Sequence, residues 1–242
     1  IHAWALRRDP LNAFHLKALQ VALLVGAPAA ILQPVSGDLA ARQVAVTQPA
    51  KFAAMEALFV TQDGAPLTIG GLPDVEARAT RLAIEVPRAL SLLTFRDAAA
   101  RIAGLDQVPR GDWPDVPVVH LSFQVMVALG SYMALVSIWA LAVLARRRDL
   151  AGRPRLLLAV ALATPLGFIA TEAGWVVTEV GRQPWVIQGV LRTADSVTPM
   201  PGLVVPFVAF TLLYVLLGVV VLVILRRLVR HAPVALDAGS RP

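Results

Sequence analysis

The chain has no cysteine among its 242 residues, and only 16% of its residues are charged. The lack of cysteine excludes disulfides, thiolate-ligated metals and cysteine-held iron–sulfur clusters. The low share of charge argues against an ordinary soluble domain, in which about 25% of residues are charged. Hydrophobic residues instead make up 57% of the sequence, and the mean hydropathy is +0.68. The composition therefore predicts an integral membrane protein surrounded by membrane lipid.

Four apolar runs approach or exceed the roughly 20 residues that a helix needs to cross a bilayer. They cover residues 14–32, 118–144, 156–177 and 203–225. Residues 1–6 look like the end of a further span, so we expect the sequence to be the C-terminal part of a longer protein. The predicted fold class is all-α, with four complete transmembrane helices, the end of a fifth, and a partly helical external loop.

The predicted spans divide the chain into four parts. Residues 1–32 hold the end of one span and the next helix, and residues 33–117 form the external segment. Residues 118–232 hold three transmembrane helices, and residues 233–242 form a disordered cytoplasmic tail.

The external segment is expected to be partly helical. Residues 39–60 and 75–93 have helical periodicity, and Pro87 should break the second helix. A turn is expected at 61–66, where Asp, Gly and Pro cluster, and a short extended piece at 67–71.

The net charge of +6 comes largely from basic residues gathered in short connections. They are Arg7, Arg8 and Lys17, then Arg146, Arg147, Arg148, Arg153 and Arg155, and finally Arg226, Arg227 and Arg230. Short loops rich in Lys and Arg remain on the cytoplasmic side of a membrane, which places 33–117 and 181–202 outside. A nucleic-acid-binding protein would instead gather basic residues on one soluble face, so no nucleic-acid partner is expected.

The third apolar run carries two carboxylates, Glu172 and Glu179. Residues seven apart share a face of a helix, and Trp175 lies between these two on that face. Ionisable groups near a membrane core are costly, so they are functional-site candidates by default. Arg182 follows Glu179 by about one turn. The simpler alternatives are that Glu179 only pairs with Arg182 at the helix end, and that Glu172 is a structural buried acid.

Trp175-x-x-x-Glu179 is followed by Gly-Arg-Gln-Pro-Trp at 181–185, and this block resembles the signature of subunit I of cytochrome bd-type quinol oxidases. Three further stretches are similar to the same family in order and spacing. They are Gly37-Asp38 with Gln-Pro-Ala-Lys-Phe-Ala-Ala-Met-Glu at 48–56, the stretch 120–130, and the stretch 191–199. The short external segment is similar to the branch of the family with a short quinol-binding loop, the Q-loop.

The resemblance implies haem as the cofactor. Met126 matches the axial ligand of a low-spin haem b, for which a neutral thioether is well suited. Glu179 matches the ligand of a high-spin haem b, Arg182 would pair with a haem propionate, and Trp175 would contact the cofactor. A third haem, of d or b type, would have its ligands outside this sequence. On pattern alone Met126 is equally a core residue, and Gln124 stands where some relatives carry Arg.

Lys51 and Glu56 match Q-loop residues of the family that take part in quinol oxidation, and Asp38 lies at the entry of that loop. A carboxylate can accept a proton from quinol, and an ammonium group can orient the quinol oxygen. An exposed loop would also carry such charges without a function. His120 is either a proton or propionate partner or a structural histidine, and its role, like that of Glu172, stays open.

The resemblance implies subunit I of a respiratory terminal oxidase in the bacterial inner membrane. It would oxidise quinol at the outer face, reduce oxygen to water and contribute to the proton-motive force, together with subunit II and small accessory subunits. The sequence alone would be inactive, because further haem ligands would lie outside it. The alternative is a multi-pass secondary transporter or membrane scaffold without haem, in which carboxylates near the membrane midplane would bind ions or substrate.

Overall fold

The computed structural model describes residues 1–146 and 149–230, except for the side chains of 228–230. The chain divides into two compact units, Ile1–Ser196 and Val197–Pro242, which are considered separately. The predicted disordered tail at 233–242 lies outside the described residues.

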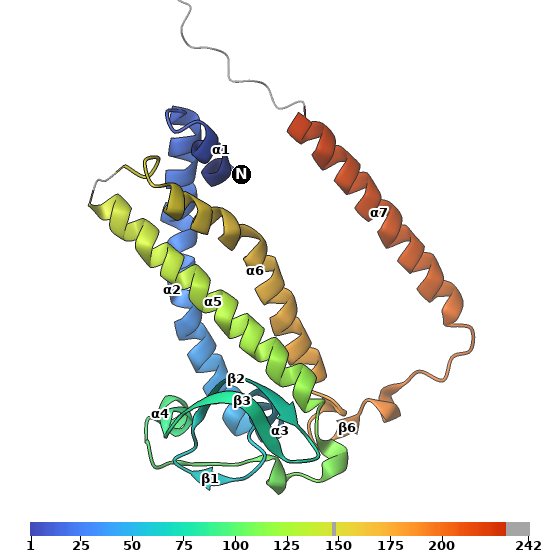
Figure 1. Cartoon of the computed structure of the whole chain (residues 1–242). Helices are drawn as coiled ribbons and strands as arrows, with labels where there is room; N and C mark the ends of the chain where they lie inside the picture. The colour runs from blue at the N-terminus through green and yellow to red at the C-terminus, as the bar shows by residue number, and fades with distance from the viewer. Residues whose placement is uncertain (147–148, 231–242) are drawn as a thin grey trace, which may run out of the picture. The chain divides into compact units, whose positions relative to one another are not determined.

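Among the residues that the structure describes, four helices are long and apolar enough to cross a membrane. They are α2 (Ala13–Thr47), α5 (Val116–Ala145), α6 (Pro154–Val180) and, in the second unit, α7 (Val204–Arg230). Each lies on one of the four apolar runs, so the predicted helical membrane fold is confirmed (Figure 1). A short helix, α1 (His2–Arg8), occupies the stretch that was expected to end a fifth span.

Helix α2 continues well beyond the expected end at residue 32. It contains Pro28 and Pro34 and ends only at Thr47. Each proline removes one backbone donor, which costs stability but does not by itself end a helix. Beyond them an Ala-rich stretch favours helix, and Asp38 and Arg42 form an ion pair between residues four apart. The first part of the predicted external segment is therefore a helical extension of α2.

The transmembrane helices of the first unit pack through apolar side chains near α1. Leu6 is fully buried there against a cluster that includes Leu19, Leu23, Ala140, Val143, Leu156 and Leu157. Helices α5 and α6 lie side by side, and Tyr132 donates a hydrogen bond across them to the carbonyl oxygen of Ala159 (Figure 1). Side-chain caps at Asn12 and Asp115 define the starts of α2 and α5.

The segment between α2 and α5 contains both helices and strands. Its elements are α3 (Pro49–Met55), β1 (Gln62–Asp63), β2 (Leu67–Asp74), β3 (Ala79–Val86), α4 (Ala89–Phe95) and β4 (Arg101–Ile102). Strands β2 and β3 form an antiparallel hairpin in which Leu67 lies opposite Val86, and β1 pairs with β4. The expected extended piece at 67–71 is confirmed as the first part of β2.

The predicted helix at 75–93 is wrong over residues 79–86, which form β3. Thr80, Leu82, Ile84 and Val86 recur at every second position, a pattern that suits a strand. The side chain of Asp74 accepts a hydrogen bond from the backbone of Ala77 and fixes the turn, so that β3 can pair with β2. The helix begins only after Pro87, as α4.

A buried core joins this segment to the ends of α5 and α6. Helix α3 is buried almost throughout, and Phe52, Ala53 and Ala54 belong to a cluster with Val119 of α5 and Val177 of α6. Leu58, Leu105 and Ile102 extend the same cluster into the loop. The packing therefore places the Gln48–Glu56 sequence motif against the N-terminal end of α5 and the C-terminal end of α6.

Candidate functional site

Lys51 of α3 lies across the C-terminal end of α6. Its side chain is 8% exposed, and its Nζ donates a hydrogen bond to the carbonyl oxygen of Thr178 at 3.3 Å. The last carbonyls of a helix lack partners within the helix, and a cation is favoured beside them. Burial, followed by the nearby Arg182 guanidinium, lowers the pKa of Lys51, whereas the Glu179 carboxylate acts in the opposite direction.

The glycine of the Gly-Arg-Gln-Pro-Trp block makes this approach possible. A Cβ on Gly181 would lie 3.1 Å from Cγ and 3.2 Å from Cε of Lys51, and it would clash with the carbonyl oxygen of Val177. Only glycine leaves the Lys51 side chain room to pass. Gly181 of the Gly-Arg-Gln-Pro-Trp block and Lys51 of the 48–56 motif lie in separate sequence motifs, but they are in contact in the structure.

Glu179 and Arg182 are both exposed at this end of α6, next to the Lys51 contact. Within the residues that the structure describes, neither of them forms an ion pair. The simpler alternative, in which Glu179 only pairs with Arg182, is therefore not what the structure contains. Glu172 and Trp175 are exposed on α6 as well, and Trp175 is 63% exposed. These groups fit a haem: the Glu179 carboxylate could ligate its iron, the Arg182 guanidinium could pair with a propionate, and the Trp175 indole could lie against the ring.

Met126 of α5 points its sulfur toward α6. A Cβ on Gly174 would lie 3.0 Å from the Met126 Sδ, so the thioether packs against the glycine backbone. The next contact of this kind is Met133 against Gly167, where the corresponding distance is 3.6 Å. A Cβ on Gly130, one turn after Met126, would meet no described atom within 4 Å. The surface of α5 at Gly130 thus leaves room for a flat macrocycle one turn from the half-buried Met126.

Glu56 is a buried carboxyl group directly after α3. It is 5% exposed, and its Oε2 has no hydrogen-bond partner among the described residues. Burial raises the pKa of Glu56 to about 8, because the carboxylate form is disfavoured away from water. An acid with a pKa near neutrality is suited to proton transfer.

Asp38 lies on α2 between two arginines. Its carboxylate pairs with Arg42 on the same helix and, at 3.1 Å, with Arg96 at the end of α4. These ion pairs join α2 to the loop. The structure thus places Lys51 near Glu179 and Arg182. Asp38 instead forms ion pairs with Arg42 and Arg96.

His120 and Gln124 also make contacts in this region that the sequence did not predict. Both lie on the first turns of α5, and their side chains bond to the backbone of the segment between α2 and α5. The only sequence signal is two polar residues four apart at the start of an apolar helix. The side-chain amide of Gln124 forms hydrogen bonds with the backbone of Thr68 and Gly70 in β2.

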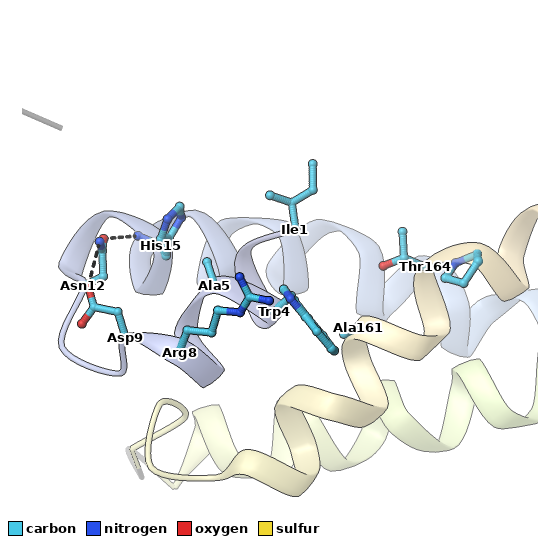
Figure 2. Close-up of a pocket in the computed structure, with 10 residues that line it drawn as sticks. Ile1, Trp4, Ala5, Arg8, Asp9, Asn12, His15, Ala161 and Thr164 are labelled. Atoms are coloured by element: carbon cyan, nitrogen blue, oxygen red, sulfur yellow. Dashed lines mark hydrogen bonds between the residues drawn. The ribbon is translucent and has the colours of Figure 1, made fainter. Parts of the chain in front are cut away.

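A cavity of about 720 Å³ lies elsewhere, beside α1 (Figure 2). It is lined by the N-terminal residues together with His15, Ala161, Thr164 and Pro165. Since α6 rises about 1.5 Å per residue, Glu179 lies roughly 20 Å further along the helix. None of the predicted site residues lines this cavity.

Comparison with known proteins adds to this geometry. The family model for "Cytochrome bd terminal oxidase subunit I" matches residues 1–233. The chain is 36% identical, over 97% of its length, to a Bacillus subtilis (strain 168) protein provisionally named cytochrome bd menaquinol oxidase subunit I. It is 30% identical, over 90% of its length, to cytochrome bd ubiquinol oxidase subunit 1 of the same organism.

A solved structure is similar as well. The bd oxidase from Geobacillus thermodenitrificans matches 96% of the chain at 32% identity, with a TM-score of 0.82. The chain spans about half the length of each of these proteins: 53% and 49% of the two Bacillus subtilis relatives, and 53% of the solved chain.

Proposed function

Since the chain belongs to the cytochrome bd terminal oxidase subunit I family, we propose that it forms the quinol-oxidising and haem-ligating part of a quinol:oxygen oxidoreductase. The observation that carries this proposal is the contact of Lys51 with the end of α6. It joins the loop motif at 48–56 to the helix end that bears Glu179 and Arg182. A site for quinol chemistry and a site for haem therefore meet in one place.

Quinol oxidation requires groups that accept the protons of the two hydroxyl groups. Glu56 is the proposed acceptor, because its buried carboxyl group has a pKa of about 8 and an Oε2 free of described partners. Lys51 orients the quinol oxygen, and the lowered pKa of its ammonium group eases the exchange of a proton. Asp38, paired with Arg42 and Arg96, acts at the loop entry by holding the loop against α2.

Two side chains are the proposed ligands of two haems. Met126 would ligate a low-spin haem b, and Glu179 would ligate a high-spin haem b, with Arg182 on a propionate and Trp175 against the macrocycle. When bound, these groups and a further haem of d or b type supply the electron transfer from quinol to oxygen. The half-buried thioether of Met126 supports this assignment, as does the Glu179 carboxylate, which forms no ion pair among the described residues.

The proposed setting is the bacterial inner membrane, with the segment 33–117 and its Q-loop on the external side. Subunit II, and small accessory subunits where they exist, would complete the enzyme. Quinol protons released outside and water protons taken from the cytoplasm would contribute to the proton-motive force. The tail at 233–242 would lie in the cytoplasm, after the last helix.

The test is to express the full-length gene in a bacterium that lacks its own quinol oxidases. Membranes should consume oxygen when a reduced quinol is added, and the purified protein should show haem bands in a reduced-minus-oxidised spectrum. A colourless protein without quinol-dependent oxygen uptake would contradict the proposal and favour a transporter or scaffold.

A further inference from the structure

We propose that His120 and Gln124 are positioning residues of the quinol site, which clamp the β2 strand and the end of α3 to the start of α5. The inference rests on the proposed function, since it names the residues that hold the same site in place. Neither side chain is proposed to touch quinol. Both would act through the backbone to which they bond.

Four polar contacts form the clamp, and the single N–H of a neutral His120 ring donates in one of its two contacts. The Nδ1 of His120 lies 2.9 Å from the carbonyl oxygen of Met55, and its Nε2 lies 3.0 Å from that of Gly70. The Oε1 of Gln124 accepts from the backbone N–H of Gly70 at 3.0 Å, and its Nε2 donates to the carbonyl oxygen of Thr68 at 2.9 Å. Residues four apart share a face of a helix, so one face of α5 holds both partners.

The side-chain amide of Gln124 matches the backbone that it meets. It accepts from one N–H and donates to the carbonyl two residues earlier, as the peptide groups of a neighbouring strand do. A carboxylate there could not donate, and the cationic side chain of Arg or Lys could not accept. The geometry therefore favours a neutral amide at this position of α5.

The backbone of β2 is shaped to meet the helix. Gly70 and Gly71 have φ angles of +68° and +97°, a region that favours glycine. At Gly70 the N–H bonds to Gln124 and the carbonyl oxygen to His120, so both of its polar groups face α5. A Cβ on Gly71 would lie 2.6 Å from Cγ2 of Thr80 in β3, which keeps the hairpin closely packed.

His120 connects the clamp to the quinol site itself. The carbonyl oxygen of Met55 belongs to the peptide group that links Met55 to Glu56, at the end of α3. His120 is fully buried, so the bond to this carbonyl is shielded from water. The His120 ring thus holds the backbone at Glu56, the proposed proton acceptor, against α5. This is also the helix that carries Met126.

The experiment compares Gln124→Leu with the unaltered full-length oxidase. Gln124→Leu should raise the KM for a soluble short-chain quinol about tenfold, the scale of one or two lost hydrogen bonds. Haem bands and oxygen uptake with an artificial electron donor should stay unchanged. Backbone amides of residues 67–74 should exchange with deuterium faster.

Thr61→Val is the matched control. In the same loop but away from α5, it removes the hydrogen bond that the Thr61 hydroxyl donates to Asp106 and the one that it accepts from the backbone N–H of Gly104. It should leave the quinol KM unchanged, so that a general loosening of the loop is separated from the loss of positioning. If Gln124→Leu fails to assemble, Gln124→Glu replaces it, because it keeps the volume and the acceptor and loses the donor to Thr68.

An unchanged quinol KM would overturn the proposal, whether or not deuterium exchange becomes faster. A rise in KM that Thr61→Val reproduces would overturn it too. If the unaltered protein oxidised no quinol at all, the proposed function would fail, and the exchange measurement would separately report whether Gln124 docks β2.

Discussion

The Nζ of Lys51 donates a hydrogen bond to the carbonyl oxygen of Thr178, a residue 127 positions later in the chain. The contact ties α3 to the helix end that carries Glu179 and Arg182. It gives the lysine two neighbours of opposite charge, whose effects on its pKa partly cancel. Variants of the loop and of the helix end are therefore expected to have related but separable effects.

Lys51→Ala and Glu56→Ala in the full-length protein should each lower the rate of quinol oxidation by tenfold or more, a modest loss for a group that assists proton transfer. The haem bands should persist, because the proposed haem ligands are on α5 and α6. Oxygen uptake is to be measured with quinol and with an artificial donor. Equal slowing with both donors would show that neither residue belongs to the quinol site.

The rate of quinol oxidation should rise with pH through about 8. Burial raises the pKa of Glu56 to about 8, so below this pH the group is a neutral acid that cannot accept a proton. The measurement is kcat/KM for quinol between about pH 6 and pH 9. In Glu56→Gln this rise should disappear, whereas the exposed Glu76→Gln should retain it. A rise that survives in Glu56→Gln would assign the titration to another group.

The same shift predicts a pH dependence of stability. The folded protein keeps the Glu56 proton up to about pH 8, while the unfolded chain releases it near the ordinary value of 4.5. The protonated Glu56 therefore stabilises the folded state fully below about pH 4.5. This contribution to the free energy of unfolding, about a few kcal/mol, is lost as the pH rises through about 8. Thermal unfolding in detergent should show a smaller loss over this window in Glu56→Gln. An equal loss in both proteins would contradict the burial of Glu56.

Gly181→Ala should disturb the end of α6 without unfolding the protein. The added methyl group would meet the Val177 carbonyl oxygen and displace the Lys51 side chain. We expect a weakened high-spin haem signal and slower quinol oxidation, with the low-spin signal unchanged. Gly26→Ala in α2 is the control, since its Cβ meets no described atom within 4 Å. Identical spectra for the two variants would show that the Gly181 contact does not support the haem site.

The membrane orientation can be tested with single cysteines at exposed positions. Ala77→Cys lies on the turn between β2 and β3, and Arg155→Cys lies at the start of α6. The arginine-rich connection before α6 predicts that Arg155 is cytoplasmic and Ala77 external. An impermeant thiol reagent should therefore label only Ala77→Cys in intact cells and both after lysis. The reverse pattern would place the quinol site on the inner face.

The sequence predicts the membrane helices well, because an apolar run long enough to span a bilayer is a local signal. It also predicts the start of β2 at residue 67, directly after the turn at 61–66 where Asp, Gly and Pro act locally. It misses the break at Gln48 between α2 and α3, because residues 39–60 were expected to be helical throughout. It fails at β3, whose strand form depends on pairing with β2, and at the end of α2, which was expected at residue 32 and lies at Thr47.

The candidate site divides in the same way. Lys51, Glu56, Met126 and Glu179 are recognisable from short motifs, each of which lies within one stretch of sequence. The contacts of Lys51 with Thr178 and of Gln124 with β2 join residues far apart in the sequence. No motif contains both partners, so such contacts follow only from the folded arrangement.

The most direct test of the whole account is the reduced-minus-oxidised spectrum of the full-length protein with Met126→Leu and, separately, with Glu179→Ala. Leucine nearly conserves the volume of methionine, so packing should lose less than about 1.5 kcal/mol. We expect Met126→Leu to remove the low-spin haem signal and keep the high-spin one, and Glu179→Ala to do the opposite. A normal low-spin signal in Met126→Leu, together with a normal high-spin signal in Glu179→Ala, would contradict the assignment of these residues as haem ligands.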